Sequence, residues 1–416
     1  MNAATPYPTV VLYSFFPWLH EYPSTAHGLA RALASYTQVI YISKPPTLKD
    51  ALSGDAASKA QRQKAVEAEH LPANLSVFEL PARLPINFLQ PGRLYDAATK
   101  INDSRLSAAV QRVLAKAGVS NYVWINLYAP DQLIDLNVRP VPAQRIYYSV
   151  DAIEQARYTA RHGALAEQRQ LTKADYGLAT SQQLAKSLSS RRLQLGLDRR
   201  AVTVLPNAMD DGNFRAELKQ TTADPIAEIK GPRAVYVGNL DGARIDFEGL
   251  TAFAKTRHDI EFVLIGPWNA SEIDRANLDA LDNVHLLGRK SPEESAIIMA
   301  HCHVGLIPFK CTALTAAIYP LKINEYLALG LPVLSTAFSM DIQSFAEVIT
   351  LAPLSEWSQL VDQTLGSNNG AEKAARQAVA AHNTWDARAT QLLALISGKE
   401  VAPQVSSASQ TPVTSC

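Results

Sequence analysis

Lys322 and Glu325 are the two ionisable side chains whose spacing most suggests chemistry. They lie in residues 308–332 (PFKCTALTAAIYPLKINEYLALGLP), where a strand ends, a loop follows, and Pro320 takes the expected first position (N1) of a helix. Free backbone amides from Leu321 onward, beside the Lys322 ammonium, would hold an anion such as a diphosphate. Glu325, about one turn further on, could accept hydrogen bonds from a ribose diol. The same pattern is also typical of surface residues on an ordinary amphipathic helix.

A second candidate phosphate site lies in residues 235–246 (VYVGNLDGARID), where a strand is followed by a glycine, a polar loop, an arginine and a helix. Gly238 would allow a ligand to approach the backbone closely. Arg244 could neutralise a diphosphate and make it a better leaving group. The dinucleotide fingerprint GxGxxG is absent. A plain strand-to-helix turn with an exposed arginine is the alternative interpretation.

Candidate acid–base groups lie in the first half of the sequence. Asp151 comes just after an expected strand, where a carboxylate could bind acceptor hydroxyls or assist proton removal. The alternative for this aspartate is a helix N-cap. His20, Glu21 and His27 lie on or near the first strand-to-helix loop, and each could equally be a helix-start or core-edge residue. For Glu167 the pattern favours a solvated helix face over a functional role.

Strands and helices alternate in both halves, which predicts two parallel sheets with helices on both faces. In the first half we expect strands at 9–15, 39–42, 123–126, 145–149, 176–179 and 201–205, and helices at 27–35 and 164–173. In the second half we expect strands at 234–237, 261–265, 284–287, 304–307, 332–335 and 348–351, and helices at 247–255, 292–300 and 321–329. Residues 48–69 are expected to form a surface loop or helix. The cleft between two such domains is where ligands usually bind.

The composition excludes several classes of protein. The 416 residues contain 39 Lys plus Arg and 39 Asp plus Glu, a balance that argues against a nucleic-acid binder. Hydrophobic residues make up 47%, enough for two buried cores. The three cysteines lack CxxC spacing, which argues against a disulfide framework and a structural zinc site. His301 and His303 have no third ligand nearby, so we expect no metal site.

Localisation follows from what the sequence lacks. No window approaches 18 consecutive apolar residues, and the N-terminus shows no secretory pattern. We therefore expect a soluble, cytoplasmic protein. Contact with the inner face of the membrane without spanning it would require exposed apolar residues, for which Phe15, Phe16 and Trp18 are candidates, although core packing also explains each of them.

The second half of the sequence resembles the donor-binding domain of GT-B glycosyltransferases, and among these the retaining group labelled glycosyl transferases group 1. The motifs that carry the resemblance are YVGNLDGARIDFEGL, FVLIGPW, NVHLLGRK, VGLIPFK and YPLKINEYLALGLPVLST. They cover most of residues 230–396. The first half fits more loosely, through HGLARALA, YISKPP, YYSVDAIEQARY, EQRQLTKADYGLATSQQLA and LPNAMDDGNF.

The resemblance also implies roles for single residues. In the family a basic pair grips the diphosphate, and its two positions are Asn239 and Arg244 here, so one charge is missing. The family also has two glutamates eight positions apart. The second is Glu325, the implied ribose ligand, while the first is Ala317, so the usual contact to a sugar hydroxyl is absent. Lys322 lies between these two positions and could compensate for the lost basic group.

The resulting prediction is an α/β protein of two facing Rossmann-like, doubly wound domains, the GT-B fold. We expect an acceptor-side domain at 1–208, a linker at 209–232, a nucleotide-sugar-binding domain at 233–384, a helix crossing back to the N-terminal domain at 385–398 and a disordered tail at 399–416. The crossing-back helix is implied by the resemblance.

The expected activity is transfer of a sugar from a UDP- or GDP-type donor to a saccharide or lipid-linked acceptor, in surface polysaccharide or glycolipid synthesis. The resemblance implies retention of anomeric configuration, and basic side chains in place of a metal; no cofactor is expected. Asp151, His27, Arg244 and Lys322 are the catalytic candidates. The donor-binding candidates are Gly238, Asn239, Arg244, Gly266, Lys290, Pro320, Leu321, Lys322 and Glu325. A sugar-nucleotide epimerase on the same fold and a catalytically silent nucleotide-sugar-binding module are the alternatives.

Overall fold

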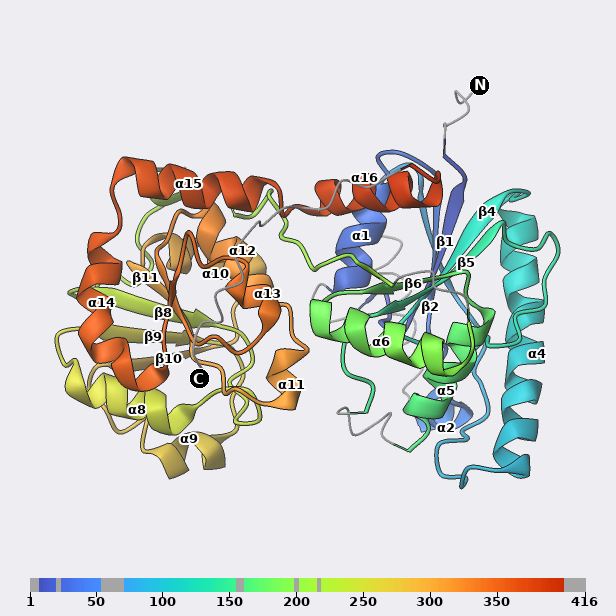
Figure 1. Cartoon of the computed structure of the whole chain (residues 1–416), viewed down its shortest axis with the longest axis horizontal. Coiled ribbons are helices and arrows are strands. Elements are labelled where there is room, and N and C mark those ends of the chain that lie inside the picture. The colour runs from blue at the N-terminus through green and yellow to red at the C-terminus, as the bar shows by residue number, and fades with distance from the viewer. Residues whose placement is uncertain are drawn as a thin grey trace. The chain divides into compact units, whose positions relative to one another are not determined.

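The computed structural model of the chain describes residues 7–19, 24–53, 71–154, 161–197, 202–214 and 218–399. The candidates His20 and Glu21, most of the expected surface segment after residue 53, and the expected disordered tail after residue 399 lie outside these residues. The described chain forms two parallel sheets, each accompanied by helices (Figure 1). This arrangement confirms the predicted fold class.

The first sheet has seven parallel strands in the order β3-β2-β1-β4-β5-β6-β7. These are β1 (Thr9–Ser14), β2 (Val39–Ser43), β3 (Leu75–Glu79), β4 (Tyr122–Leu127), β5 (Gln144–Ser149), β6 (Tyr176–Ala179) and β7 (Thr203–Val204). The helices of this part are α1 (Thr25–Leu33), α2 (Leu48–Ser53), α4 (Arg93–Lys116), α5 (Gly163–Lys173) and α6 (Gln182–Gln194). Every residue of β2 and β4 is buried, as expected for strands covered on both faces.

The second sheet has six parallel strands in the order β10-β9-β8-β11-β12-β13. These are β8 (Arg233–Val237), β9 (Glu261–Ile265), β10 (Val284–Gly288), β11 (Val304–Ile307), β12 (Val333–Ser335) and β13 (Thr350–Leu351). Its helices are α7 (Leu218–Thr221), α8 (Phe247–Thr256), α9 (Ala270–Ala276), α10 (Pro292–Ala300), α11 (Ala313–Ala316), α12 (Leu321–Ala328), α13 (Met340–Gln343), α14 (Trp357–Gly366) and α15 (Gly370–Ala381), with a short 3₁₀ turn at Leu354–Glu356.

Contacts divide the chain into two compact units, with breaks after Pro206 and after Ala387. The last helix, α16 (Trp385–Ile396), therefore belongs to the N-terminal unit from Arg388 onward. Arg388 is fully buried there, and its Nε donates to the Pro206 carbonyl oxygen at 3.1 Å. At the other end of the helix, the Gln144 amide donates to the Ile396 carbonyl oxygen at 3.2 Å.

The stretch expected to be a linker, 209–232, is instead part of the C-terminal unit. Phe214, Leu218, Ile226 and Ile229 are all buried in the core of that unit. Arg233, at the start of β8, also ties the stretch down, because its guanidinium pairs with Asp224 at 2.7 Å. The stretch looks polar in the sequence because its few core residues are widely spaced and follow no single period.

The ranges expected from the sequence do not include helices α4 and α6 or strand β3 of the N-terminal unit. Helix α4 has 24 residues, but its buried face includes the polar side chains of Thr99, Asn102, Asp103 and Ser107, which obscure the apolar stripe. Strand β3 lies at the sheet edge and is only partly buried. In the C-terminal unit, strand β13 is shorter than expected. Cys302 is a buried free thiol, whereas Cys311 is exposed.

Candidate functional site

Three glycines mark the carboxyl ends of neighbouring strands in the second sheet. Gly238 follows β8, Gly266 follows β9 and Gly288 ends β10, with φ values of 141°, 143° and 70° that other residues rarely adopt. A Cβ atom on Gly266 would lie 1.8 Å from the Gly238 carbonyl oxygen. The first two loops therefore touch backbone to backbone at the sheet edge where parallel α/β folds bind ligands.

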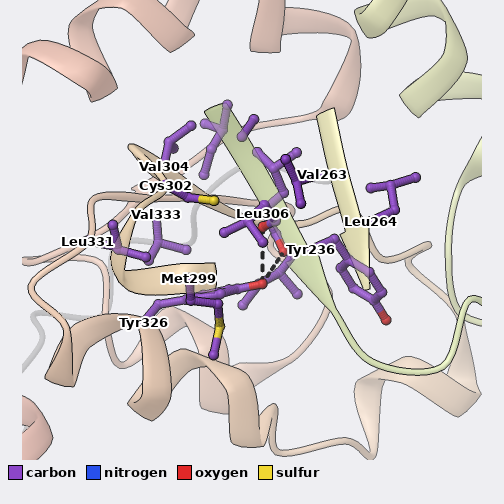
Figure 2. Packing of buried hydrophobic residues seen from close by; sticks show 14 of the residues in the cluster. Tyr236, Val263, Leu264, Met299, Cys302, Val304, Leu306, Tyr326, Leu331 and Val333 are labelled. Atoms are coloured by element: carbon purple, nitrogen blue, oxygen red, sulfur yellow. Dashed lines mark hydrogen bonds between the residues drawn. The ribbon is translucent and has the colours of Figure 1, made fainter. Parts of the chain in front are cut away.

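Helix α12 is held against this edge by Tyr326 (Figure 2). The buried hydroxyl of Tyr326 accepts a hydrogen bond from the Val237 amide at 3.2 Å and lies 3.1 Å from the Val235 carbonyl oxygen. Gly305, in β11, makes room for the ring, because a Cβ atom there would lie 2.6 Å from it. These contacts fix the helix that carries Lys322 and Glu325 against strands β8 and β11.

The Lys322 ammonium is half-buried among aromatic rings. Its Nζ lies 5.2 Å from the centroid of the Tyr236 ring and 4.8 Å from that of Phe309. A Cβ atom on Gly238 would lie 3.3 Å from the Lys322 Cε and 3.1 Å from the Tyr236 hydroxyl oxygen, so that glycine leaves room for both side chains. Burial lowers the pKa of Lys322 to about 8, and the positive charge of Arg244 acts in the same direction.

The loop that carries Arg244 is fastened to the loop after β11. The Lys310 amide donates to the Arg244 carbonyl oxygen at 2.7 Å, and the Asp246 amide donates to the Pro308 carbonyl oxygen at 2.9 Å. The side chain of Arg244 is half-buried and its Nε has no hydrogen-bond partner among the described residues. The charge of Arg244 helps to lower the pKa of Lys322, while the Glu325 carboxylate acts more strongly to raise it. No ion pair to a carboxylate is found for either among the residues described.

The start of α12 lies beside these cations. Pro320 is the N-cap of the helix, not its N1 residue as predicted, because its ψ of 104° is extended and the helix begins at Leu321. No side chain caps this end, whereas Asp246 caps α8 and Ser291 caps α10. The amides of Leu321 and Lys322 have no acceptor in the described part of the chain, and such amides attract anions.

Glu325 lies one turn along the same helix and is half-buried. Burial raises its pKa to about 7, while the nearby Lys322 ammonium acts to lower it. When ionised, this carboxylate offers acceptor oxygens to a diol. The adjoining side chain of Asn324 is used differently, because it is buried and bonded to the Tyr319 hydroxyl at 3.2 Å.

Two further donor-binding candidates, and the family position at Ala317, have different surroundings. Asn239 is exposed, and its carbonyl oxygen accepts from the Tyr236 hydroxyl at 3.1 Å. Ala317 is buried at the C-cap of α11, so the carboxylate that the family carries at this position is missing. Lys290 is exposed after β10, the edge strand of the sheet, and no interaction joins it to Arg244 or Lys322.

Among the N-terminal candidates, His27 has both ring nitrogens in use. Its Nδ1 accepts from the Ser24 amide at 3.0 Å in a capping box at the start of α1, so Nε2 carries the proton. Nε2 lies 2.9 Å from the Trp18 carbonyl oxygen, to which it donates. The ring also stacks on Tyr41. These contacts give His27 a structural role at the start of α1, and its catalytic role stays a prediction.

Asp151 lies half-buried in the bend after β5, as expected, and the described helix that follows is capped by His162 instead. Glu167 contradicts the prediction of a solvated helix face, because its side chain is 3% exposed. It accepts from the Tyr147 hydroxyl at 3.0 Å and pairs with Arg191. Burial raises the pKa of Glu167 and Arg191 opposes that rise.

Two kinds of feature were sought throughout the described residues: membrane-spanning helices and metal sites. No helix in it combines the length and the apolar character needed to cross a bilayer. No cluster of three or more His, Cys, Asp or Glu side chains suited to a metal ion is found in the same residues. Trp18 is 5% exposed and packs against His27 and Tyr41, so it is a core residue and not the membrane contact considered from the sequence.

Two features of the site were not predicted from the sequence. They are the aromatic residues around Lys322 and the hydrogen bonds that hold the loop before Arg244. Glu272 accepts from the Gly242 amide at 2.8 Å, and the Lys310 ammonium donates to the Gly242 carbonyl oxygen at 2.7 Å. Tyr236 belongs to β8 and Phe309 follows β11, so the two rings meet only when these strands pair. The lysine at the end of VGLIPFK was a visible signal, since a cation just after a strand lies at the ligand edge.

Comparisons with known proteins agree with this architecture. Residues 231–362 match the family Glycosyl transferases group 1. TuaH of Bacillus subtilis (strain 168), whose name assigns it to teichuronic acid biosynthesis as a glycosyltransferase, is 28% identical over 174 residues. That alignment covers 41% of this chain and 42% of TuaH, so the match spans about two fifths of that relative's length.

Solved structures share the fold across nearly the whole chain. Sucrose-phosphate synthase from Thermosynechococcus elongatus matches with a TM-score of 0.64 at 18% identity, covering 94% of this chain and 98% of that one. An E. coli trehalose-6-phosphate protein bound to UDP-2-fluoro glucose matches with a TM-score of 0.66 at 11% identity, with 93% and 98% covered. Anabaena HepE in complex with UDP matches with a TM-score of 0.60 at 14% identity, with 94% and 100% covered.

Proposed function

We propose, from the premise that this chain has the GT-B fold and that its residues 231–362 form a glycosyl transferases group 1 domain, that it is a glycosyltransferase using a nucleotide-sugar donor. The donor would be held by the C-terminal unit, and its diphosphate would lie between Arg244, Lys322 and the start of α12. A UDP-sugar is the first candidate, because the matching HepE and E. coli structures are complexes with UDP or a UDP-sugar derivative. A GDP-type donor is the second.

One observation carries this proposal: Arg244 and Lys322 are half-buried cations at one site with no carboxylate paired to either among the residues described. Two like charges brought together disfavour the folded state. The Glu325 carboxylate offsets part of that repulsion, and a bound anion would relieve the rest. The uncapped start of α12 adds backbone donors to the same place. A diphosphate matches this combination of two point charges and a row of amides.

The chemistry follows from these positions. The bond between the anomeric carbon and the diphosphate oxygen breaks, and the negative charge on the departing diphosphate is stabilised by Arg244, Lys322 and the amides. The acceptor hydroxyl oxygen forms the new bond to the anomeric carbon. Its proton passes to the departing phosphate oxygen or to a base, for which Asp151 is the candidate. We propose retention of configuration and no requirement for a metal. Glu325 would orient the ribose.

The acceptor is proposed to be a saccharide or a lipid-linked sugar in surface polysaccharide or glycolipid synthesis. The support is the likeness to TuaH, which is named for teichuronic acid biosynthesis. The exchange of two family positions, Asn239 and Ala317, would alter how the sugar hydroxyls are held and thereby which sugar is transferred. A peripheral contact with the inner face of the membrane fits a lipid-linked acceptor.

A thermal-shift screen against UDP, GDP, ADP and CMP sugars tests the donor site. A ligand at about 100 times its Kd should stabilise the protein by roughly 2.7 kcal/mol. Arg244→Ala and Lys322→Ala should each abolish that shift in a protein that remains folded. Lys255→Ala, which removes an exposed lysine of α8, is the matched control and should keep it. Normal donor binding by both site variants would refute the phosphate assignment.

Product analysis with and without acceptor then separates the possible activities. A transferase releases nucleoside diphosphate only as it glycosylates an acceptor or, slowly, water. An epimerase converts the donor with no acceptor present. A silent binding module gives the thermal shift but no turnover in either condition.

A further inference from the structure

Helix α4 presents an unusual outer face. Its exposed charged side chains are all basic, and they are Arg93, Lys100, Arg105, Arg112 and Lys116. The whole chain has equal numbers of basic and acidic residues, so this face departs from the average. The opposite face is buried in the N-terminal core through Leu106, Val110, Val113 and Leu114. The helix runs along the outside of the N-terminal unit (Figure 1).

The acids on or near α4 do not neutralise this face. Asp96 is half-buried and pairs with Arg169 at 2.8 Å. Asp103 is buried and accepts from the Leu133 amide at 2.7 Å. Glu79, exposed at the end of β3, lines the same hollow as Arg112 and Lys116 and offsets one charge. Several positive charges of the face therefore remain uncompensated.

Apolar side chains are exposed at the N-terminal end of the same face. Leu94 is 77% exposed and Phe88 is 69% exposed, the two highest values for large hydrophobic residues in the described chain. Ile101, two turns after Leu94, is 52% exposed. At 3.6 residues per turn, Leu94, Ile101, Arg105, Arg112 and Lys116 fall within an arc of about 60°. One stripe of α4 is thus apolar at its start and basic further along.

Hydrogen bonds from a neighbouring segment of the chain hold the turn that carries Phe88. Arg161 donates to the Phe88 carbonyl oxygen at 3.1 Å, and the His162 Nε2 lies 3.0 Å from the Leu89 carbonyl oxygen. The His162 ring also stacks on Tyr95 of α4, with the ring centroids 3.9 Å apart. These contacts hold the turn before α4 in place while the Phe88 ring stays exposed.

We propose that this face, made of Phe88, Leu94, Ile101, Arg105, Arg112 and Lys116, docks on a bilayer that contains anionic lipid. Exposed apolar side chains beside a row of Lys and Arg are typical of surfaces that insert shallowly among lipid headgroups. The basic side chains pair with anionic headgroups, and their aliphatic stems lie along the interface. The proposal deepens the proposed function, because it places the N-terminal, acceptor-side unit at the surface where lipid-linked acceptors occur.

Vesicle co-sedimentation of the full-length protein tests this proposal. Vesicles of phosphatidylcholine are compared with vesicles of phosphatidylcholine and phosphatidylglycerol. Wild type should bind only the second kind, and less so at high salt. The triple change Arg105→Gln, Arg112→Gln, Lys116→Gln should weaken binding on the order of a hundredfold. The double change Phe88→Gln, Leu94→Gln should weaken it at every salt concentration.

Matched controls exclude general effects of charge and hydrophobicity. The triple change Lys219→Gln, Lys230→Gln, Lys255→Gln removes the same number of exposed positive charges from the C-terminal unit, and Leu193→Gln changes an exposed leucine of α6. Both controls should bind vesicles like wild type. The α4 variants should keep the donor-induced thermal shift, and Lys322→Ala should keep vesicle binding. The proposals for the docking surface and for the donor site can therefore be refuted independently.

Three results would overturn the proposal. The first is wild-type protein that sediments with neither kind of vesicle, and the second is α4 variants that bind as well as wild type. The third is a wild-type oligomer, detected by light scattering, that the α4 changes dissociate while vesicle binding is absent, in which case the face contacts a second copy of the chain.

Discussion

The Tyr326 hydroxyl accepts a hydrogen bond from the Val237 amide at 3.2 Å, and thereby joins the helix that carries Lys322 to the strand that leads into Gly238. The two sides of the proposed diphosphate site thus depend on one buried side chain. The position of the cation relative to the glycine loop is set by a contact inside the core and not by the loop itself.

Tyr326→Phe should therefore weaken both stability and donor binding. Removing the hydroxyl leaves the buried Val237 amide without its partner, which costs about 1–3 kcal/mol in the free energy of unfolding. The loss is measured by urea denaturation. Donor affinity, measured by calorimetry, should also fall because α12 is less firmly held. Tyr319→Phe, which alters a hydroxyl bonded to Asn324, is the comparison, and an equal loss of donor affinity there would contradict the specific role of Tyr326.

Gly266→Ala should be strongly destabilising. A Cβ atom would lie 1.8 Å from the Gly238 carbonyl oxygen, and the φ of 143° is itself unfavourable for alanine. We expect a loss of more than about 3 kcal/mol, or no folded protein. Gly366→Ala is the control, since a Cβ atom there meets nothing within 4 Å and the residue ends helix α14. Thermal unfolding should show a large loss of stability for the first variant and little change for the second. A stable Gly266→Ala variant would mean that the loops after β8 and β9 lie further apart than the 1.8 Å contact implies.

The pH dependence of donor binding should report on Lys322. Its pKa is lowered to about 8, so the free protein loses this charge as the pH rises through that value, and the affinity for UDP should fall above about pH 8. Lys322→Arg keeps its charge at every accessible pH and should bind UDP with little change between pH 7 and pH 9. Calorimetric titrations at several pH values check this. A wild-type affinity that stays constant over this range would contradict the buried position of the ammonium.

Lys322 and Glu325 should change the free energy of unfolding with pH in opposite directions. Lys322 is protonated more readily in the unfolded chain, so between about pH 8 and its ordinary value of 10.5 the free energy of unfolding should rise with pH. Glu325, with its pKa raised from 4.5 to about 7, is protonated more readily in the folded chain, so stability should fall as the pH rises across that interval. Urea denaturation of wild type against Lys322→Met and Glu325→Gln measures each slope. A slope that survives the matching substitution belongs to another group.

Lys310→Met should weaken donor binding without abolishing folding. Its ammonium donates to the Gly242 carbonyl oxygen while Glu272 accepts from the Gly242 amide, and this peptide lies two residues before Arg244. Losing one such hydrogen bond, at about 1 kcal/mol, should raise the Kd for UDP about fivefold. Lys310→Arg should restore most of the affinity. Unchanged affinity in Lys310→Met would show that the backbone contacts of the loop suffice.

The strand order of the two sheets could not be predicted from the sequence. The alternation of strands and helices, and the helix that begins beside Lys322, were predicted. These features are local, since they depend on runs of apolar residues and on turn residues. The structural role of His27 was not foreseen because the capping box with Ser24 was not recognised. Helix α4 was missed because its buried polar residues, such as Asp103, bond to a loop that is distant in sequence.

The surroundings of Lys322 could not be predicted for a related reason. Tyr236 and Phe309 lie at the ends of β8 and β11, and they meet because these strands pair. The lowered pKa of the lysine depends on that burial, so it becomes visible only once the tertiary structure is known. The burial of Glu167 is a similar case, because its partner Arg191 lies on the next helix.

Because of helix α16, the two units become complete at different stages of synthesis. Within the described residues, the C-terminal unit is the stretch from residue 207 to residue 387, whereas the N-terminal unit also includes Arg388 and the residues of α16 after it. On the ribosome the N-terminal unit begins first, but it would receive α16 only after residues 207–387 have been made. Until the final helix emerges, the carbonyl group of Pro206 and the apolar surface that α16 covers would stay open to water and to chaperones.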